Sequence, residues 1–279
     1  MSIPSTPPPL GPYDFGHTPA TACRLDQRFS YLLHVPKEGD PATRRILVAV
    51  HGTERANHVY RDLFAPLADA LNLIILAPLF PCGIDDPHDR DNYKYIEYRG
   101  IRFDRILLSM VDEVAARYAV PEGPFALFGF SGGAHFVHRF FYLHPHRLSA
   151  LSVCAPGSPT LLDADRPWWV GVADMEARFG CALNIAAMRR VAVHLAVGLA
   201  DLDTWEITHR PGSAHWMEGA NDSGTTRVDR LRALHRSLQA QGIEARMELL
   251  AGVRHERAAM VGQAEKFFSS FYGQRDAAA

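Results

Sequence analysis

The chain has 279 residues, of which 47% are hydrophobic and 22% charged, so it can bury a sizeable core and is not globally disordered. Its formal net charge of −2 gives no strong field that would attract nucleic acid or an anionic membrane. The N-terminus lacks the basic and apolar regions of a secretory signal, and no apolar stretch is long enough to span a bilayer. We therefore expect a cytoplasmic protein without a nucleic-acid or membrane partner.

Strand-like and helix-like patterns alternate along most of the chain. Residues 1–26, rich in proline, are predicted as an N-terminal arm, and residues 27–279 as one domain. Short apolar runs indicate buried strands, and apolar residues at helical spacing indicate helices. In chain order these are strands 27–36 and 45–50, helix 59–71, strand 73–79, helix 104–118, strand 124–130, helix 132–143, strands 148–155 and 191–197, helix 225–241, strand 245–251 and helix 256–272. The alternation predicts an α/β fold with a mostly parallel sheet and helices on both faces.

Two long segments interrupt this alternation. Residues 80–98 are expected to form a polar loop, because they are rich in charged residues. Residues 156–188 contain tryptophans, prolines and short helical fragments between two clear strands. We expect this second segment to be a small cap insertion above the sheet.

The most specific pattern is the pentapeptide GFSGG at residues 129–133, which lies between a predicted strand and a predicted helix. It matches G-x-S-x-G, in which the serine occupies a tight turn and the flanking glycines leave room for it. Ser131 is therefore the candidate nucleophile. The amide of Gly132 is a candidate oxyanion-hole donor, since it begins the following helix.

A second donor for the oxyanion is expected from the loop after strand 45–50. That loop begins with His51, Gly52 and Thr53, and the Thr53 amide is the candidate.

A serine hydroxyl is a poor nucleophile at neutral pH and needs a base beside it. Of 14 histidines, His255 is the candidate because it follows strand 245–251 directly and precedes the last helix. In α/β folds, catalytic groups lie in loops at the carboxyl ends of the strands. His135 and His138 lie on the helix after Ser131, where we expect packing roles.

An acid that orients His255 is expected between the serine and the histidine in chain order. Asp201 lies in the loop just after strand 191–197 and is the favoured candidate, while Asp203 remains an alternative. The acid would hold the imidazole ring and stabilise the imidazolium.

The order Ser131, Asp201, His255, together with GFSGG and the His-Gly-Thr loop, resembles the α/β-hydrolase superfamily over residues 27–272. The run YLLHVP is similar to bacterial esterases and polyhydroxybutyrate-depolymerase-like proteins. The resemblance implies an α/β-hydrolase fold and cleavage of a small carboxylic ester through an acyl-enzyme, without cofactor or metal. An amidase or acyltransferase with the same residues, or a ligand-binding protein without activity, are the alternatives.

Aromatic residues of the two long segments are candidates for contact with substrate. Trp168 and Trp169 lie in the cap insertion, and Tyr98 ends the polar loop. They could line an apolar pocket, although each of them could instead pack the cap onto the sheet.

Overall fold

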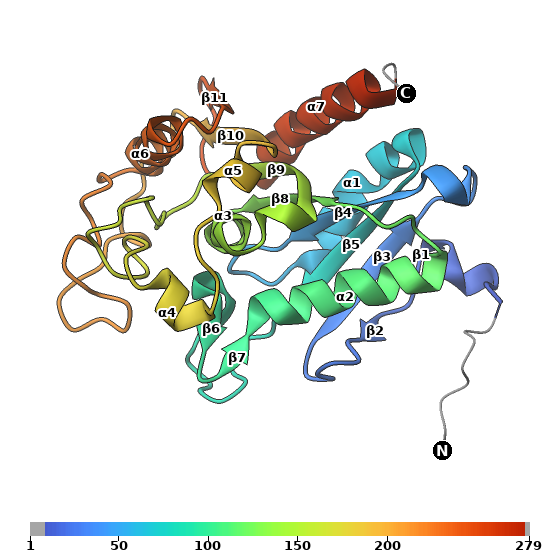
Figure 1. Ribbon diagram of the computed structural model, residues 1–279, viewed down its shortest axis with the longest axis horizontal. Coiled ribbons are helices and arrows are strands. Elements are labelled where there is room, and N and C mark those ends of the chain that lie inside the picture. Colours follow the sequence, from blue (N-terminus) through green and yellow to red (C-terminus); the bar gives the residue numbers. More distant parts are fainter. Residues whose placement is uncertain (1–8, 277–279) are drawn as a thin grey trace.

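A twisted, mostly parallel sheet forms the centre of the molecule. The structure is a computed structural model that describes residues 9–276, and within this range the sheet has nine strands in the order β1-β3-β5-β4-β8-β9-β10-β11, with β2 also paired to β3 (Figure 1). From β5 to β11 all neighbours run parallel, whereas β3 is antiparallel to β5. These strands are β1 (Gly16–His17), β2 (Thr21–Ala22), β3 (Ser30–Val35), β4 (Arg45–Val50), β5 (Leu73–Leu79), β8 (Phe125–Phe130), β9 (Leu148–Cys154), β10 (Ala192–Gly198) and β11 (Ala245–Leu250).

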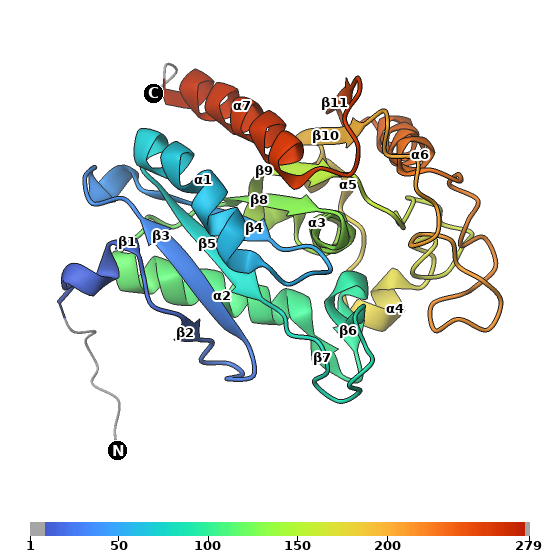
Figure 2. The ribbon, with the colours of Figure 1, turned by 180° about the vertical axis from the view of Figure 1, so that it is seen from behind.

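Helices cover both faces of the sheet. Helices α1 (Asn57–Leu71) and α7 (Arg257–Asp276) pack together on one face of the sheet (Figure 2). The Phe64 and Phe268 rings meet between them, with centroids 6.4 Å apart. Helices α2 (Phe103–Tyr118) and α3 (Gly132–Leu143) lie on the other face, and α6 (Arg227–Ala240) packs on β10 and β11. Every residue of β8 and β9 is buried, as expected for strands covered on both sides. No helix within residues 9–276 combines the length and the apolar character that a bilayer crossing requires.

The predicted strands and helices are all confirmed, and the differences lie at their ends. The first predicted strand begins three residues later, at Ser30, and the last helix continues to Asp276. Within the predicted arm, β1 and β2 extend the sheet, and Asp14 is held by Arg117 at 2.9 Å. Residues 1–8 of that arm and residues 277–279 of the predicted domain lie outside the described residues.

The segment predicted as a polar loop is more ordered than its composition indicates. It contains the 3₁₀ helix η3 (Asn92–Tyr95), whose residues are all buried, and β6 (Glu97–Tyr98), which pairs with β7 (Ile101–Arg102). Burial is possible because the polar groups of η3 find partners. Asn92 donates to the Pro81 carbonyl at 2.8 Å, and the Tyr93 hydroxyl donates to the His51 carbonyl at 2.9 Å.

Two long connections lie together at one end of the molecule, beyond the carboxyl ends of the strands (Figure 1). The first, between β9 and β10, is the predicted cap and carries α4 (Met175–Phe179) and α5 (Ile185–Met188). The second, residues 199–226, was not singled out by the sequence and contains no helix or strand. It is joined to the first by the Arg166–Asp222 ion pair at 2.7 Å and by the Trp169 indole N–H, which donates to the His215 carbonyl at 3.0 Å. The short helices η1 (Pro12–Asp14), η2 (Pro41–Thr43) and η4 (Pro145–Arg147) complete the connections.

The contact of β8 with α3 leaves no room for a side chain at Gly129. A β-carbon there would overlap the Gly133 carbonyl and lie 2.8 Å from Val137 Cγ2. We expect Gly129→Ala to lower the free energy of unfolding by about 2–3 kcal/mol, because helix backbone cannot yield easily. Gly262→Ala is the control: no atom lies within 4 Å of its added β-carbon, so helix propensity should raise stability by up to about 1 kcal/mol. Urea unfolding measures both, and equal effects would contradict this packing argument.

Candidate active site

Ser131 is the single residue between β8 and α3, and its backbone is strained. Its φ of 54° and ψ of −118° lie outside the regions that residues with a β-carbon prefer. Two hydrogen bonds hold this conformation. The Ser131 N–H donates to the Cys154 carbonyl at 2.9 Å, and its own carbonyl accepts from the His135 N–H at 3.2 Å. The side chain is half-buried, at the carboxyl edge of the sheet.

The two predicted oxyanion-hole residues lie beside each other. A β-carbon built on Gly132 would lie 3.1 Å from the Thr53 nitrogen, so the β4–α1 loop closely approaches the start of α3. The Thr53 carbonyl accepts from an Arg55 N–H at 2.8 Å, which fixes the loop on its other side. The backbone segments of Thr53 and Gly132 therefore lie side by side at the end of the sheet.

The predicted histidine and acid form a direct pair. His255 Nδ1 lies 2.6 Å from Asp201 Oδ2, and Asp201 is 2% exposed. The second oxygen of this carboxylate accepts from Arg227 at 3.1 Å, and Arg227 also binds Glu206 at 2.6 Å. The carboxylate is thus fixed from two sides, and the Nδ1 contact leaves Nε2 of His255 available for a proton.

The imidazole of His255 packs against the residue before the serine. Its ring centroid lies 4.5 Å from that of Phe130, with the planes tilted by 31°. Across residues 9–276 no hydrogen bond joins Ser131 to His255. Such bonds are often long in unliganded enzymes, and they tighten when substrate binds.

The alternative acid has different surroundings. The Asp203 side chain is exposed, and only its carbonyl makes a hydrogen bond to Arg227, at 3.3 Å. The structure therefore brings Asp201 to His255.

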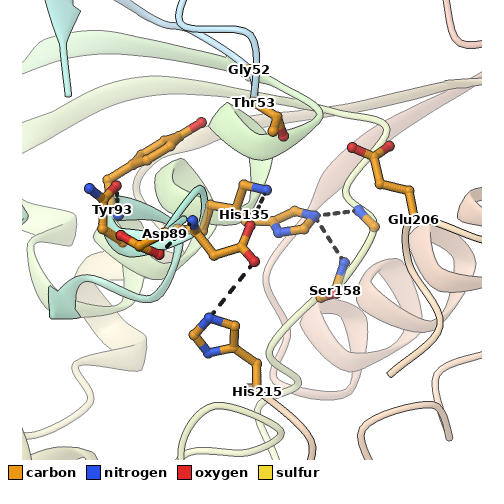
Figure 3. A network of polar contacts seen from close by, with 12 residues as sticks. Gly52, Thr53, Asp89, Tyr93, His135, Ser158, Glu206 and His215 are labelled. Carbon is orange, nitrogen blue, oxygen red and sulfur yellow. Dashed lines mark hydrogen bonds and ion pairs between the residues drawn. The ribbon is translucent and has the colours of Figure 1, made fainter. Parts of the chain in front are cut away.

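Three buried histidines near this edge of the sheet each accept hydrogen bonds from backbone amides. His51 Nε2 accepts from Phe80, and His138 Nε2 accepts from Thr160. His135 Nε2 accepts from both Gly157 and Ser158, at 2.7 and 3.0 Å (Figure 3). The sequence analysis expected packing roles for His135 and His138, and the structure adds that both tie the cap backbone to α3. Burial lowers the pKa of His51 to about 3 and holds the pKa values of His135 and His138 well below 6.5.

The predicted substrate-contacting residues line one cavity of about 660 Å³, together with Tyr95, His215 and Trp216. Trp168 and Trp169 are themselves buried, and the Trp168 indole N–H donates to the Tyr95 carbonyl at 3.3 Å. Tyr98 is half-buried. All three aromatic residues therefore line this cavity, and Trp168 and Trp169 also pack the cap.

Several charged residues near the site were missed by the sequence analysis. Arg227 orients Asp201, although it lies at the first position of α6, where the helix dipole disfavours a cation. That unfavourable position is the one feature of the sequence that indicates a special role for Arg227. Lys94 is buried beside Gly132, and Arg139 is buried within α3, but their segments are predicted only as a loop and a helix. Nothing in their local sequence indicates this burial.

A second cavity of about 720 Å³ lies at the opposite edge of the sheet, next to the first residues of β4 and β8, and so is remote from Ser131. The part of the chain that the structure describes contains no group of three or more His, Cys, Asp or Glu side chains able to hold a metal ion. The four cysteines are free.

Comparison with solved structures shows that the chain has the α/β-hydrolase fold. It is similar to poly(aspartic acid) hydrolase-1 from Sphingomonas sp. KT-1, with 21% identity over 85% of this chain and 92% of the other and a TM-score of 0.69. It is also similar to LpqC, the poly(3-hydroxybutyrate) depolymerase from Bordetella parapertussis, with 21% identity, coverage of 86% and 85% and a TM-score of 0.68. The siderophore hydrolase EstA from Aspergillus nidulans is 15% identical, with coverage of 98% and 100% and a TM-score of 0.59. No protein-family model and no curated protein sequence matches the chain.

The neutral histidines make stability depend on pH. Below about pH 6.5 a histidine in the unfolded chain binds a proton, whereas the buried ring in the folded protein stays neutral. The free energy of unfolding should therefore fall as the pH falls towards about 3, the pKa of folded His51. Each buried ring contributes a slope of up to about 1.4 kcal/mol per pH unit. His138→Gln removes one such ring while a glutamine oxygen can still accept from Thr160, so the slope between about pH 6 and 4 should become shallower by about this amount.

Urea unfolding at a series of pH values measures this slope. The exposed His88 provides the control, because His88→Gln removes a histidine without removing a buried acceptor. An unchanged slope in His138→Gln would show that His138 is not excluded from protonation.

Proposed function

We propose that the protein is a serine hydrolase that cleaves carboxylic esters through an acyl-enzyme. The observation that carries the proposal is the pair of His255 and the buried Asp201, packed beside Phe130 and next to the strained turn of Ser131. The similar solved structures include an esterase, a depolymerase and other hydrolases, which supports the same general class.

In the first half of the reaction, Ser131 Oγ attacks the ester carbonyl carbon while His255 Nε2 takes the hydroxyl proton. Asp201 holds the ring through Nδ1 and stabilises the imidazolium, and Arg227 keeps the carboxylate in place. The negative charge on the former carbonyl oxygen is held by the Thr53 and Gly132 N–H groups. When the tetrahedral intermediate collapses, the alkoxide leaves with the proton from His255.

In the second half, water replaces the alcohol. His255 takes a proton from the water, the hydroxide attacks the acyl carbon, and the proton returns to Ser131 Oγ as the acid leaves. This sequence requires only groups of the protein and water.

Replacing the nucleophile should abolish turnover. We expect Ser131→Ala to lower kcat on a nitrophenyl ester by about 10⁴-fold or more, since no other group can form the acyl-enzyme. A fluorophosphonate probe should label the parent and not the variant. Ser269→Ala, an exposed serine on α7, is the control and should retain activity and labelling. Parental turnover by Ser131→Ala would end this proposal, and binding of ligands without turnover by the parent would favour a non-catalytic role.

The two candidate acids can be separated by matched amides. Asp201→Asn should lower kcat by about 10³–10⁴-fold, because an amide cannot stabilise the imidazolium and can favour the wrong tautomer of His255. Asp203→Asn should stay within about threefold of the parent, since that side chain is exposed. Steady-state kinetics on one ester measures both variants. A larger loss in Asp203→Asn than in Asp201→Asn would reverse the assignment.

A further inference from the structure

A buried lysine lies against the proposed oxyanion hole. A β-carbon built on Gly132 would be 2.9 Å from Lys94 Cε and 3.1 Å from the Thr53 nitrogen. The ammonium is one bond beyond Cε, so it lies beside the same two backbone segments. Lys94 is 7% exposed, which is rare for a lysine unless it is paired.

The ammonium has one acidic partner. Lys94 Nζ donates to Asp91 Oδ1 at 2.6 Å, and within residues 9–276 this is its one hydrogen bond. An ammonium carries three N–H donors, so two remain for a ligand. Asp91 has a second basic neighbour, because its other oxygen lies 3.8 Å from His215 Nε2. Burial would raise the pKa of Asp91, but the nearby Lys94 lowers this pKa below its ordinary value, so the Asp91 carboxylate is ionised.

Further cations surround this pair without carboxylates of their own. Arg139 is fully buried and donates to the carbonyls of Lys94 and Ser158 at 2.6 and 2.8 Å, and Arg230 is 1% exposed and donates to backbone carbonyls and Asn221. Arg55 donates to the Thr53 carbonyl. In the described part of the chain none of these three arginines forms an ion pair. Lys94 and Arg55 act on Asp91 directly, Arg139 holds the Lys94 carbonyl, and Asp89 is a second carboxylate close to His215.

Buried cations in a medium of low dielectric constant are screened weakly, so they attract an anionic group that comes close to them. An anionic group of the substrate beside Lys94 would accept from the remaining N–H groups of the ammonium and offset the nearby positive charge.

We propose that Lys94 is a specificity-determining residue that binds a carboxylate on the acyl chain of the ester, so that monoesters of dicarboxylic acids are preferred over neutral esters. This inference rests on the proposed ester hydrolysis. The leaving oxygen of the ester must lie at His255, because His255 gives it a proton. Lys94 lies instead at the proposed oxyanion hole, where it pairs with Asp91, the residue before η3. We therefore assign the bound carboxylate to the acyl side of the ester.

The test compares substrates that share a scaffold and differ in charge. The released methanol is measured for monomethyl and dimethyl adipate, and for the corresponding succinates, to give kcat/KM for each. The parent should favour the monomethyl ester. Lys94→Gln keeps a group that can bind Asp91. This variant should lower the ratio of monomethyl to dimethyl kcat/KM by about 10- to 100-fold, mostly through a change in KM. A loss of this size corresponds to one charged hydrogen bond.

Asp91→Asn should move the same ratio upwards by several-fold, because it removes the negative charge that competes for Lys94. Opposite directions in the two variants exclude a general loss of folding as the cause. Lys266→Gln, an exposed lysine on α7, is the charge-matched control and should leave the ratio unchanged.

A ratio that Lys94→Gln does not change would overturn the inference while leaving ester hydrolysis intact. If kcat also falls equally on both esters, Lys94 stabilises the oxyanion or the fold. If the parent cleaves neither these esters nor a nitrophenyl ester, the proposed function fails and the inference fails with it.

Discussion

The tight junction of β8 with α3 is the constraint on which the rest of the site depends. Ser131 can stand between a buried strand and a buried helix only because the backbone of Gly133 approaches both Gly129 and the end of β4. This contact fixes the direction of α3, and with it the Gly132 amide and His135. A helix placed slightly farther from the sheet would leave Ser131 without its bond to Cys154 and the cap without its contacts to α3.

The edge of the sheet is held by neutral acceptors and by buried cations, which act differently. His51, His135 and His138 satisfy amides of connecting segments that have no ladder partner, and they do so as uncharged rings. Arg139 and Arg230 instead donate to carbonyls and keep their charge. The same backbone requirement that orders the cap therefore also buries positive charge at this edge of the sheet.

The acid of the proposed triad shows how a distant residue sets a local geometry. Asp201 follows β10, and Arg227 begins α6 after the long segment 199–226. The bridge from Arg227 to Asp201 and Glu206 closes this segment onto the sheet and orients the carboxylate towards His255. Since the segment also packs on the cap, the position of the acid depends on contacts made by both insertions.

The sequence by itself determined the order of strands and helices and the tight turn at Ser131, and it supplied His255 and Asp201 as the candidates for the proposed triad. These features depend on local periodicity, on turn chemistry and on the rule that parallel strands end at one edge. The tertiary structure alone decided that residues 92–95 are buried, that Arg227 holds Asp201, and that Lys94 lies beside Gly132. Such contacts join residues far apart in the chain. Whether a charged side chain is buried depends on partners supplied by other segments, and no local pattern records those partners.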